Sequence, residues 1–138
     1  MLSTKAKEQL IAAVHSWIPD TLAVYVFGSA ASGNMNAESD IDVAILRRPG
    51  TDLDVESVFQ LKTDLAVLFK RDIDLVDMLT ADDVTRAQVI TSGELVMCTD
   101  TTYCAAFETS ALAKYADLNE ARREILEDIK RRGSIYGG

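Results

Sequence analysis

Apolar residues recur along this chain at two spacings, and each spacing predicts one kind of secondary structure. Short runs rich in β-branched and aromatic residues predict strands over residues 22–27, 41–46, 73–78 and 94–98. Spacings of three and four residues predict helices over residues 3–18, 54–69, 80–92 and 99–132. In the third of these helices we expect Thr80 as the N-cap, Asp83 in the N3 position and Gly93 at the end.

The last predicted helix is unusually long. Residues 100–132 contain neither proline nor glycine, and their apolar side chains keep helical spacing. A continuous helix of this length would extend roughly 45–50 Å, which is longer than a domain of this size is wide. We therefore expect part of it to project or to pack on a partner. The tail that follows, residues 133–138, is expected to be flexible.

Length and composition predict one domain, residues 1–138, with a single core. A net charge of −8 argues against direct nucleic-acid binding, because such binding depends on neutralising phosphates with Lys and Arg. The first ten residues carry charges and lack an apolar stretch, so we expect no signal peptide, no membrane anchor and a cytoplasmic location. Cys98 and Cys104 are expected to be reduced, partly buried thiols.

Candidate chemistry lies between the first two strands. The first strand ends at Gly28-Ser29, where backbone N–H groups and a hydroxyl meet little side-chain bulk, so phosphates can approach closely. Asp40 and Asp42 lie two residues apart where the second strand begins, so both side chains project from one face. Like charges this close repel, and a bound cation is the natural way to keep both ionised. Ser39 either caps the strand entry or contacts the bound nucleotide and metal.

A third acid is expected from the next strand, where Asp72 and Asp74 share one face and Asp77 takes the other. We select Asp74, because an unpaired carboxylate embedded between apolar residues inside a strand would be costly without a metal or a donor. Asp72 is interpreted as a solvated strand end. Five basic residues could neutralise a leaving pyrophosphate, although a solvated surface position is the better interpretation of each. They are Arg47, Arg48, Lys62, Lys70 and Arg71.

The order Gly28-Ser29, ten residues, then Asp40-Ile41-Asp42, with a third acid on a later strand, resembles the signature of the DNA polymerase β-type nucleotidyltransferase superfamily. The chain length, the second-strand sequence SDIDVAIL and the long final helix are similar to its minimal nucleotidyltransferase branch, in particular the antitoxin half of HEPN/MNT toxin–antitoxin pairs. The resemblance covers essentially the whole chain. It implies an α/β (α+β) fold, in which a small mixed sheet of about four strands is backed by helices and followed by the long C-terminal helix.

The same resemblance implies a chemistry: two Mg²⁺ ions, ATP as substrate, and transfer of AMP to a tyrosine of a cognate HEPN ribonuclease toxin. The toxin would be the partner in a hetero-oligomer. Gly28 and Ser29 would hold the triphosphate, and Asp40 and Asp42 would carry metals that bridge it. Asp74 would ligate the second metal and help to deprotonate the incoming hydroxyl, which attacks in line at the α-phosphorus.

Two other functions stay open. One is a noncatalytic module that binds nucleotide or masks a toxin by contact. The intact Gly28, Ser29, Asp40 and Asp42 argue against it, since a degenerate copy should have lost a metal-binding acid. The other is a transferase acting on a small molecule or on RNA ends. We rank it third, because such relatives usually append a further domain, for which no length is expected to remain.

Overall fold

The computed structural model describes residues 2–28, 31 and 40–132. Its four strands form one mixed sheet in the order β3-β2-β1-β4, with β1 antiparallel to both β2 and β4, and β2 parallel to β3. The strands are β1 (Thr21–Phe27), β2 (Ile41–Arg47), β3 (Ile73–Asp77) and β4 (Glu94–Cys98). The helices are α1 (Thr4–Trp17), α3 (Val55–Phe69), α4 (Asp83–Ser92) and α5 (Thr101–Arg131). The fold class and all of these elements confirm the sequence prediction, with differences of at most three residues at any end.

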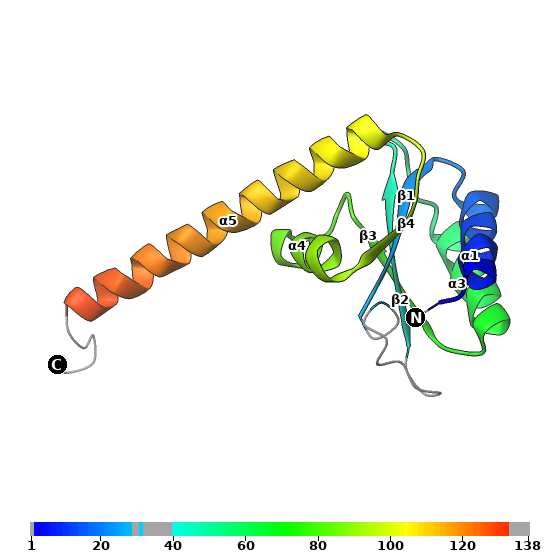
Figure 1. The fold of residues 1–138 in the computed structure, drawn as a ribbon, viewed down its shortest axis with the longest axis horizontal. Helices are drawn as coiled ribbons and strands as arrows, with labels where there is room; N and C mark the ends of the chain where they lie inside the picture. Colours follow the sequence, from blue (N-terminus) through cyan, green and yellow to red (C-terminus); the bar gives the residue numbers. More distant parts are fainter. Residues whose placement is uncertain (1, 29–30, 32–39, 133–138) are drawn as a thin grey trace.

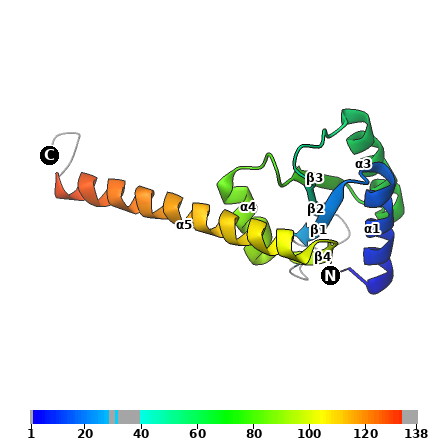
Figure 2. The same cartoon turned by 90° about the horizontal axis from the view of Figure 1, so that it is seen from above.

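Helices cover both faces of the sheet (Figures 1 and 2). Helices α1 and α3 pack on one face, where Leu10, Val14, Leu61 and Leu65 are fully buried against alternate residues of the strands. The opposite face meets α4 and the first part of α5 through a second buried cluster. This cluster contains Ala23, Tyr25, Ala44, Leu46, Met78, Val89 and Cys104. The alternation of strand residues between the two clusters is what period-two geometry requires.

Helix α4 begins two residues later than the capping pattern predicts. The Asp82 side chain, rather than that of Thr80, accepts the N-terminal hydrogen bond, from the Thr85 amide at 2.7 Å. Asp83 is therefore the first helical residue and not the third. The hydroxyl of Thr80 is instead 3.3 Å from the carboxylate of Asp77, in the turn that follows β3. Thr80 and Asp82 can both act as a cap, and the contact of Thr80 with Asp77 in the turn after β3 leaves this role to Asp82.

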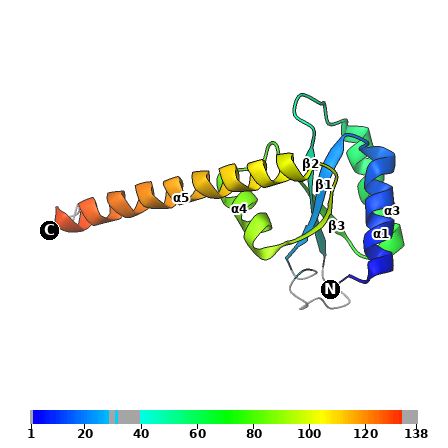
Figure 3. The same cartoon turned by 45° about the horizontal axis from the view of Figure 1, so that its top comes forward.

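Helix α5 confirms the prediction of one long helix. Its 31 residues extend about 46 Å at 1.5 Å per residue. Cys104 and Ala111 are its buried residues, and the buried Tyr25 hydroxyl donates a 2.7 Å hydrogen bond to Glu108. Beyond these contacts the helix leaves the rest of the molecule and projects, as Figures 1 and 3 show. No helix among the described residues is long and apolar enough to cross a membrane.

Arg47 is not the solvated residue that its sequence position suggested. Its side chain is only 11% exposed, and its Nη2 lies 3.0 Å from Oδ2 of Asp77. The guanidinium also donates to the backbone oxygen of Thr51, so it joins the ends of β2 and β3 to the loop after β2. The predicted facing of Asp77 explains this pair, because Asp77 lies on the same side of the sheet as Arg47.

Candidate active site

The candidate site lies at one end of the sheet, where β1 ends and β2 and β3 begin. Asp42 is the register partner of Phe27 on one side and of Asp74 on the other. The parallel pairing of β2 with β3 therefore brings two of the predicted acids side by side across neighbouring strands. Asp40 precedes β2 and is exposed. By alternation, Asp42 and Asp74 lie on the face of the sheet that α4 and α5 cover.

Gly28 follows β1 directly and lies against Asp42. Its φ of +68° falls in the left-handed region, which glycine adopts without the steric cost of a Cβ. A Cβ built at this position would collide with the Oδ2 atom of Asp42. The absence of a side chain at Gly28 thus makes room for the Asp42 carboxylate, in addition to the close phosphate approach predicted from the sequence.

The electrostatics of the site are those of clustered acids. Partial burial, the charge of Asp74 and the charge of Asp40 raise the pKa of Asp42, in that order of size. Burial disfavours the charge of Asp42 itself, and the two neighbouring carboxylates disfavour a further negative charge beside their own. A cation bound among the carboxylates would reverse the effect, because it favours the ionised form.

The prediction that the Asp74 carboxylate is buried is wrong. Asp74 nevertheless lies beside Asp42, as expected of a third acid of the site. The structure shows an exposed carboxylate, because β3 is an edge strand of the sheet at this point. Its place beside Asp42 comes from strand register, which the single-strand pattern did not contain. Asp72 is exposed just before β3 and its backbone oxygen accepts from the Ile41 amide, so its interpretation as a solvated strand end is confirmed.

The fit of the site to a metal ion depends on its donor atoms. In the part of the chain that the structure describes, no three His, Cys, Asp or Glu side chains converge into a preformed metal site. The donors of Asp40, Asp42 and Asp74 are nevertheless all carboxylate oxygens, which hard cations such as Mg²⁺ prefer. Burial is the first cause of the raised pKa of Asp42 and repulsion from Asp74 and Asp40 adds to it, and a bound cation would relieve this repulsion. The chemistry of these residues therefore fits Mg²⁺.

Two predicted nucleotide contacts, Ser29 and Ser39, lie outside the described residues, as does the tail 133–138.

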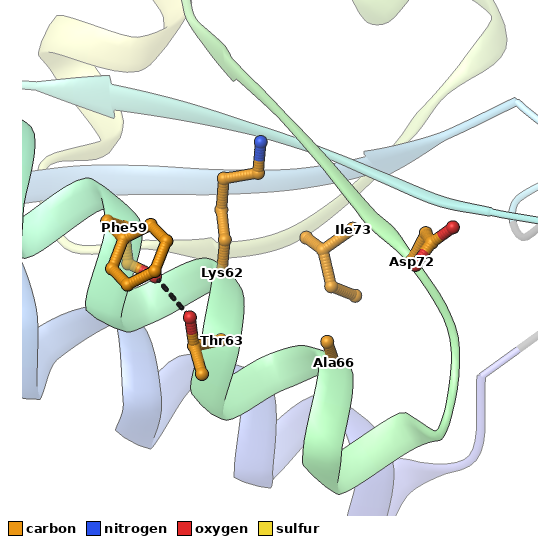
Figure 4. Close-up of a pocket in the computed structure, with 6 residues that line it drawn as sticks. All are labelled: Phe59, Lys62, Thr63, Ala66, Asp72 and Ile73. Carbon is orange, nitrogen blue, oxygen red and sulfur yellow. Dashed lines mark hydrogen bonds between the residues drawn. The ribbon is translucent and has the colours of Figure 1, made fainter.

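The structure contains a cavity near β3 that the sequence did not predict. Its volume is about 400 Å³ and it lies between α3 and β3 (Figure 4). It is lined by Phe59, Lys62, Thr63, Ala66, Asp72 and Ile73. Because Ile73 belongs to the α1–α3 core, this cavity faces away from the side of the sheet that carries Asp42 and Asp74.

Comparison with known proteins agrees with this geometry. Residues 8–102 match the family described as Polymerase beta, Nucleotidyltransferase. The chain belongs to this family and is a nucleotidyltransferase.

Individual members of this family resemble the chain over most of its length. The protein adenylyltransferase MntA of Shewanella oneidensis is 30% identical over 123 residues, which cover 89% of this chain and 86% of that protein. A crystal structure of a toxin–antitoxin with AMP-PNP contains a chain that is 30% identical, with a TM-score of 0.76, covering 90% of this chain and 98% of that one. A structure of the tri-AMPylated Shewanella oneidensis HEPN toxin in complex with MNT antitoxin matches at 27% identity, with a TM-score of 0.73, covering 94% and 99%.

Proposed function

We propose that this nucleotidyltransferase is an antitoxin that transfers AMP from ATP to a tyrosine hydroxyl of a cognate HEPN ribonuclease toxin, with which it forms a hetero-oligomer. The observation that carries the proposal is the meeting of Gly28, Asp42 and Asp74 at one end of the sheet. The AMP-PNP and AMPylated-toxin complexes of similar chains support the donor and the acceptor. Use of ATP supports a cytoplasmic location.

Each residue has a proposed role. Asp40, Asp42 and Asp74 would hold two Mg²⁺ ions, which supply positive charge to the triphosphate and acidify the attacking hydroxyl. Gly28 and Ser29 bind the triphosphate, and Ser39 contacts the nucleotide. The tyrosine oxygen bonds to the α-phosphorus, the bond to pyrophosphate breaks, and Asp74 helps to take the hydroxyl proton. Pyrophosphate leaves with the electron pair of the broken bond.

Masking of the toxin without chemistry is the second candidate function. The placement of Asp42 beside Asp74 across neighbouring strands, with Gly28 against Asp42, favours catalysis over masking, because masking by contact needs no such group of acids. Transfer to a small molecule or to RNA ends is the third, and the net charge of −8 disfavours an RNA acceptor.

Incubating the purified chain with α-labelled ATP and Mg²⁺ in a lysate of the source cells separates these functions. The proposal requires label on a small protein that is absent after deletion of the gene for the cognate HEPN toxin. Label on RNA or on a small molecule would overturn the acceptor, and no label anywhere would favour masking.

A further inference from the structure

The projecting part of α5, residues 112–131, exposes large apolar side chains. Ile125 and Leu126 are 60% and 62% exposed, and Leu112 and Ile129 are both 37% exposed. Contiguous exposed apolar side chains on a soluble domain mark an interaction surface more often than isolated ones do. Within the described residues, Tyr115 of this segment lines a cavity with α4, and the ion pairs from Glu120 onward are formed within the helix itself.

Two of the exposed apolar residues, Ile125 and Ile129, continue the buried face of the same helix. Cys104, Ala111, Leu118 and Ile125 follow one another at intervals of seven, and Tyr115 and Ile129 each lie four residues after a member of this series. Residues seven apart lie on one side of a helix, so this stripe runs from the body of the molecule straight onto the projection. A heptad stripe is the pattern by which one helix packs on another, which indicates a helical partner.

Helix α4 extends this surface toward the candidate site. Val84, Ala87, Gln88 and Thr91 of α4 line a cavity of about 320 Å³ together with Tyr115 of α5. Val84 is 39% exposed at this cavity. At its other end α4 approaches the last residues of β1, since a Cβ on Gly93 would lie 3.1 Å from both the Phe27 Cβ and the Val26 oxygen.

The candidate acids lie on the same side of the sheet as this surface. Asp42 and Asp74 lie on the face of the sheet that α4 and α5 cover, so a protein held against these helices is on the catalytic side. In Figure 1, α5 starts at the far end of the sheet and slants so that its last turns draw level with the end where β2 begins. A protein that lies between the projecting part of α5 and this face of the sheet can therefore reach the site with one of its own side chains.

The similar solved structures favour a toxin protein, rather than a second copy of this chain, as the partner at this surface. A coverage of 94% leaves about 8 of the 138 residues unmatched, so most of the projecting helix is shared with a relative crystallised together with a toxin. Residues 112–132 carry six basic and five acidic side chains, in a chain of net charge −8. Apolar contact rather than net charge must therefore drive docking at this segment.

We infer that the inner face of α5, from Tyr115 to Ile129, together with the cavity between α4 and α5, docks a helix of the acceptor HEPN protein and holds it on the catalytic side. This inference rests on the proposed function for the identity of the partner. It assigns affinity for the acceptor to a surface remote from the nucleotide site, so binding and chemistry can be disturbed separately.

The test compares two double variants with the wild type, using the cognate HEPN protein of the proposed function as the probe. Ile125→Glu/Ile129→Glu places two charges on the stripe. Val55→Glu/Val67→Glu is the matched control on α3, where these side chains are 82% and 74% exposed on the other side of the sheet. Thermal unfolding should be unchanged in both, because neither pair belongs to a buried cluster.

We expect the α5 variant to bind the HEPN protein at least tenfold more weakly and to raise the KM for it by a similar factor, with kcat near wild type. The α3 variant should match the wild type in both. Equal binding by all three proteins would overturn the inference and leave the proposed function intact. A wild type that binds but transfers no AMP would overturn the function, while the binding comparison would still decide the inference. A wild-type dimer that the α5 variant dissociates, without a change in HEPN binding, would assign the stripe to a second copy.

Discussion

Gly28 and Gly50 allow the effect of a collision to be separated from that of backbone strain. Both have positive φ, at +68° and +83°, but a Cβ at Gly50 meets nothing within 4 Å, whereas one at Gly28 meets the Asp42 carboxylate. We predict that Gly50→Ala costs about 1 kcal/mol of stability through strain and leaves activity unchanged. Gly28→Ala should lose more stability and at least 100-fold in AMP transfer, because Asp42 must move. Urea denaturation and initial rates measure both effects; equal activity in the two variants would contradict the contact.

Asp42 should limit the stability of the protein without ligand. Its raised pKa means that the folded state binds its proton more tightly than the unfolded chain does. This contribution to stability is therefore present at low pH and is lost as the pH rises from the usual aspartate pKa through the raised one. We predict that Asp42→Asn is more stable than wild type at about pH 7 and that the difference disappears below about pH 4. Denaturation midpoints without Mg²⁺ check this, and a less stable variant at neutral pH would contradict it.

The candidate acids could be found from the sequence because a strand fixes which residues share a face. Asp40 and Asp42 needed only their spacing and a β-rich run after them. The reason given for Asp74 was wrong, since its carboxylate is exposed. Its neighbourhood to Asp42 depends on which strands pair and in which register, and a single strand carries no information on either.

At the scale of elements, the position of β3 should give two nearby aspartates, Asp72 and Asp74, different effects on AMP transfer. Asp74 pairs in register with Asp42, whereas Asp72 precedes the strand and lines the cavity on the α3 side. We predict that Asp74→Asn lowers AMP transfer at least 100-fold and that Asp72→Asn changes it less than threefold. Initial rates across a Mg²⁺ titration give the comparison. Equal losses in the two variants would mean that the facing of β3 is misassigned.

The ion pair between Arg47 and Asp77 should stabilise the opposite end of the β2–β3 pair. Their side chains are 11% and 13% exposed, and Asp77 also accepts from the Leu79 amide. We predict that Asp77→Ala costs roughly 3 kcal/mol, because it leaves the Arg47 charge buried without its partner. A melting temperature about 10 °C lower would express that loss. AMP transfer per folded molecule should persist, and a change below about 2 °C would show that water or another group replaces the carboxylate.

The existence and type of the elements followed from their periodicity, but local details did not. The start of α4 illustrates the limit. Thr80 and Asp82 are both competent caps by composition, and the choice depended on Asp77 engaging Thr80 and on Arg86 donating to the backbone oxygens of Met78 and Leu79. Burial of Arg47 was equally invisible, because its partner lies thirty residues away on another strand.

At the scale of the whole molecule, the length of α5 was predictable and its direction was not. The absence of proline and glycine over residues 100–132 was sufficient for the length. Its direction depends on contacts made far along the chain, such as the hydrogen bond from Tyr25 to Glu108. That long-range geometry places the apolar stripe of α5 beside the same face of the sheet as the acids, which composition alone did not indicate.

The most direct measurement is the intact mass of the cognate HEPN protein, after coexpression with the wild type or with Asp40→Ala/Asp42→Ala. Wild type should add the mass of one or more AMP units, mapped to a tyrosine. The double variant should leave the HEPN protein unmodified even where the two proteins still copurify, because it removes two of the three acids and not the surface of α5. An unmodified HEPN protein in the presence of wild type, neutralised equally well by the double variant, would contradict catalysis and establish masking by contact.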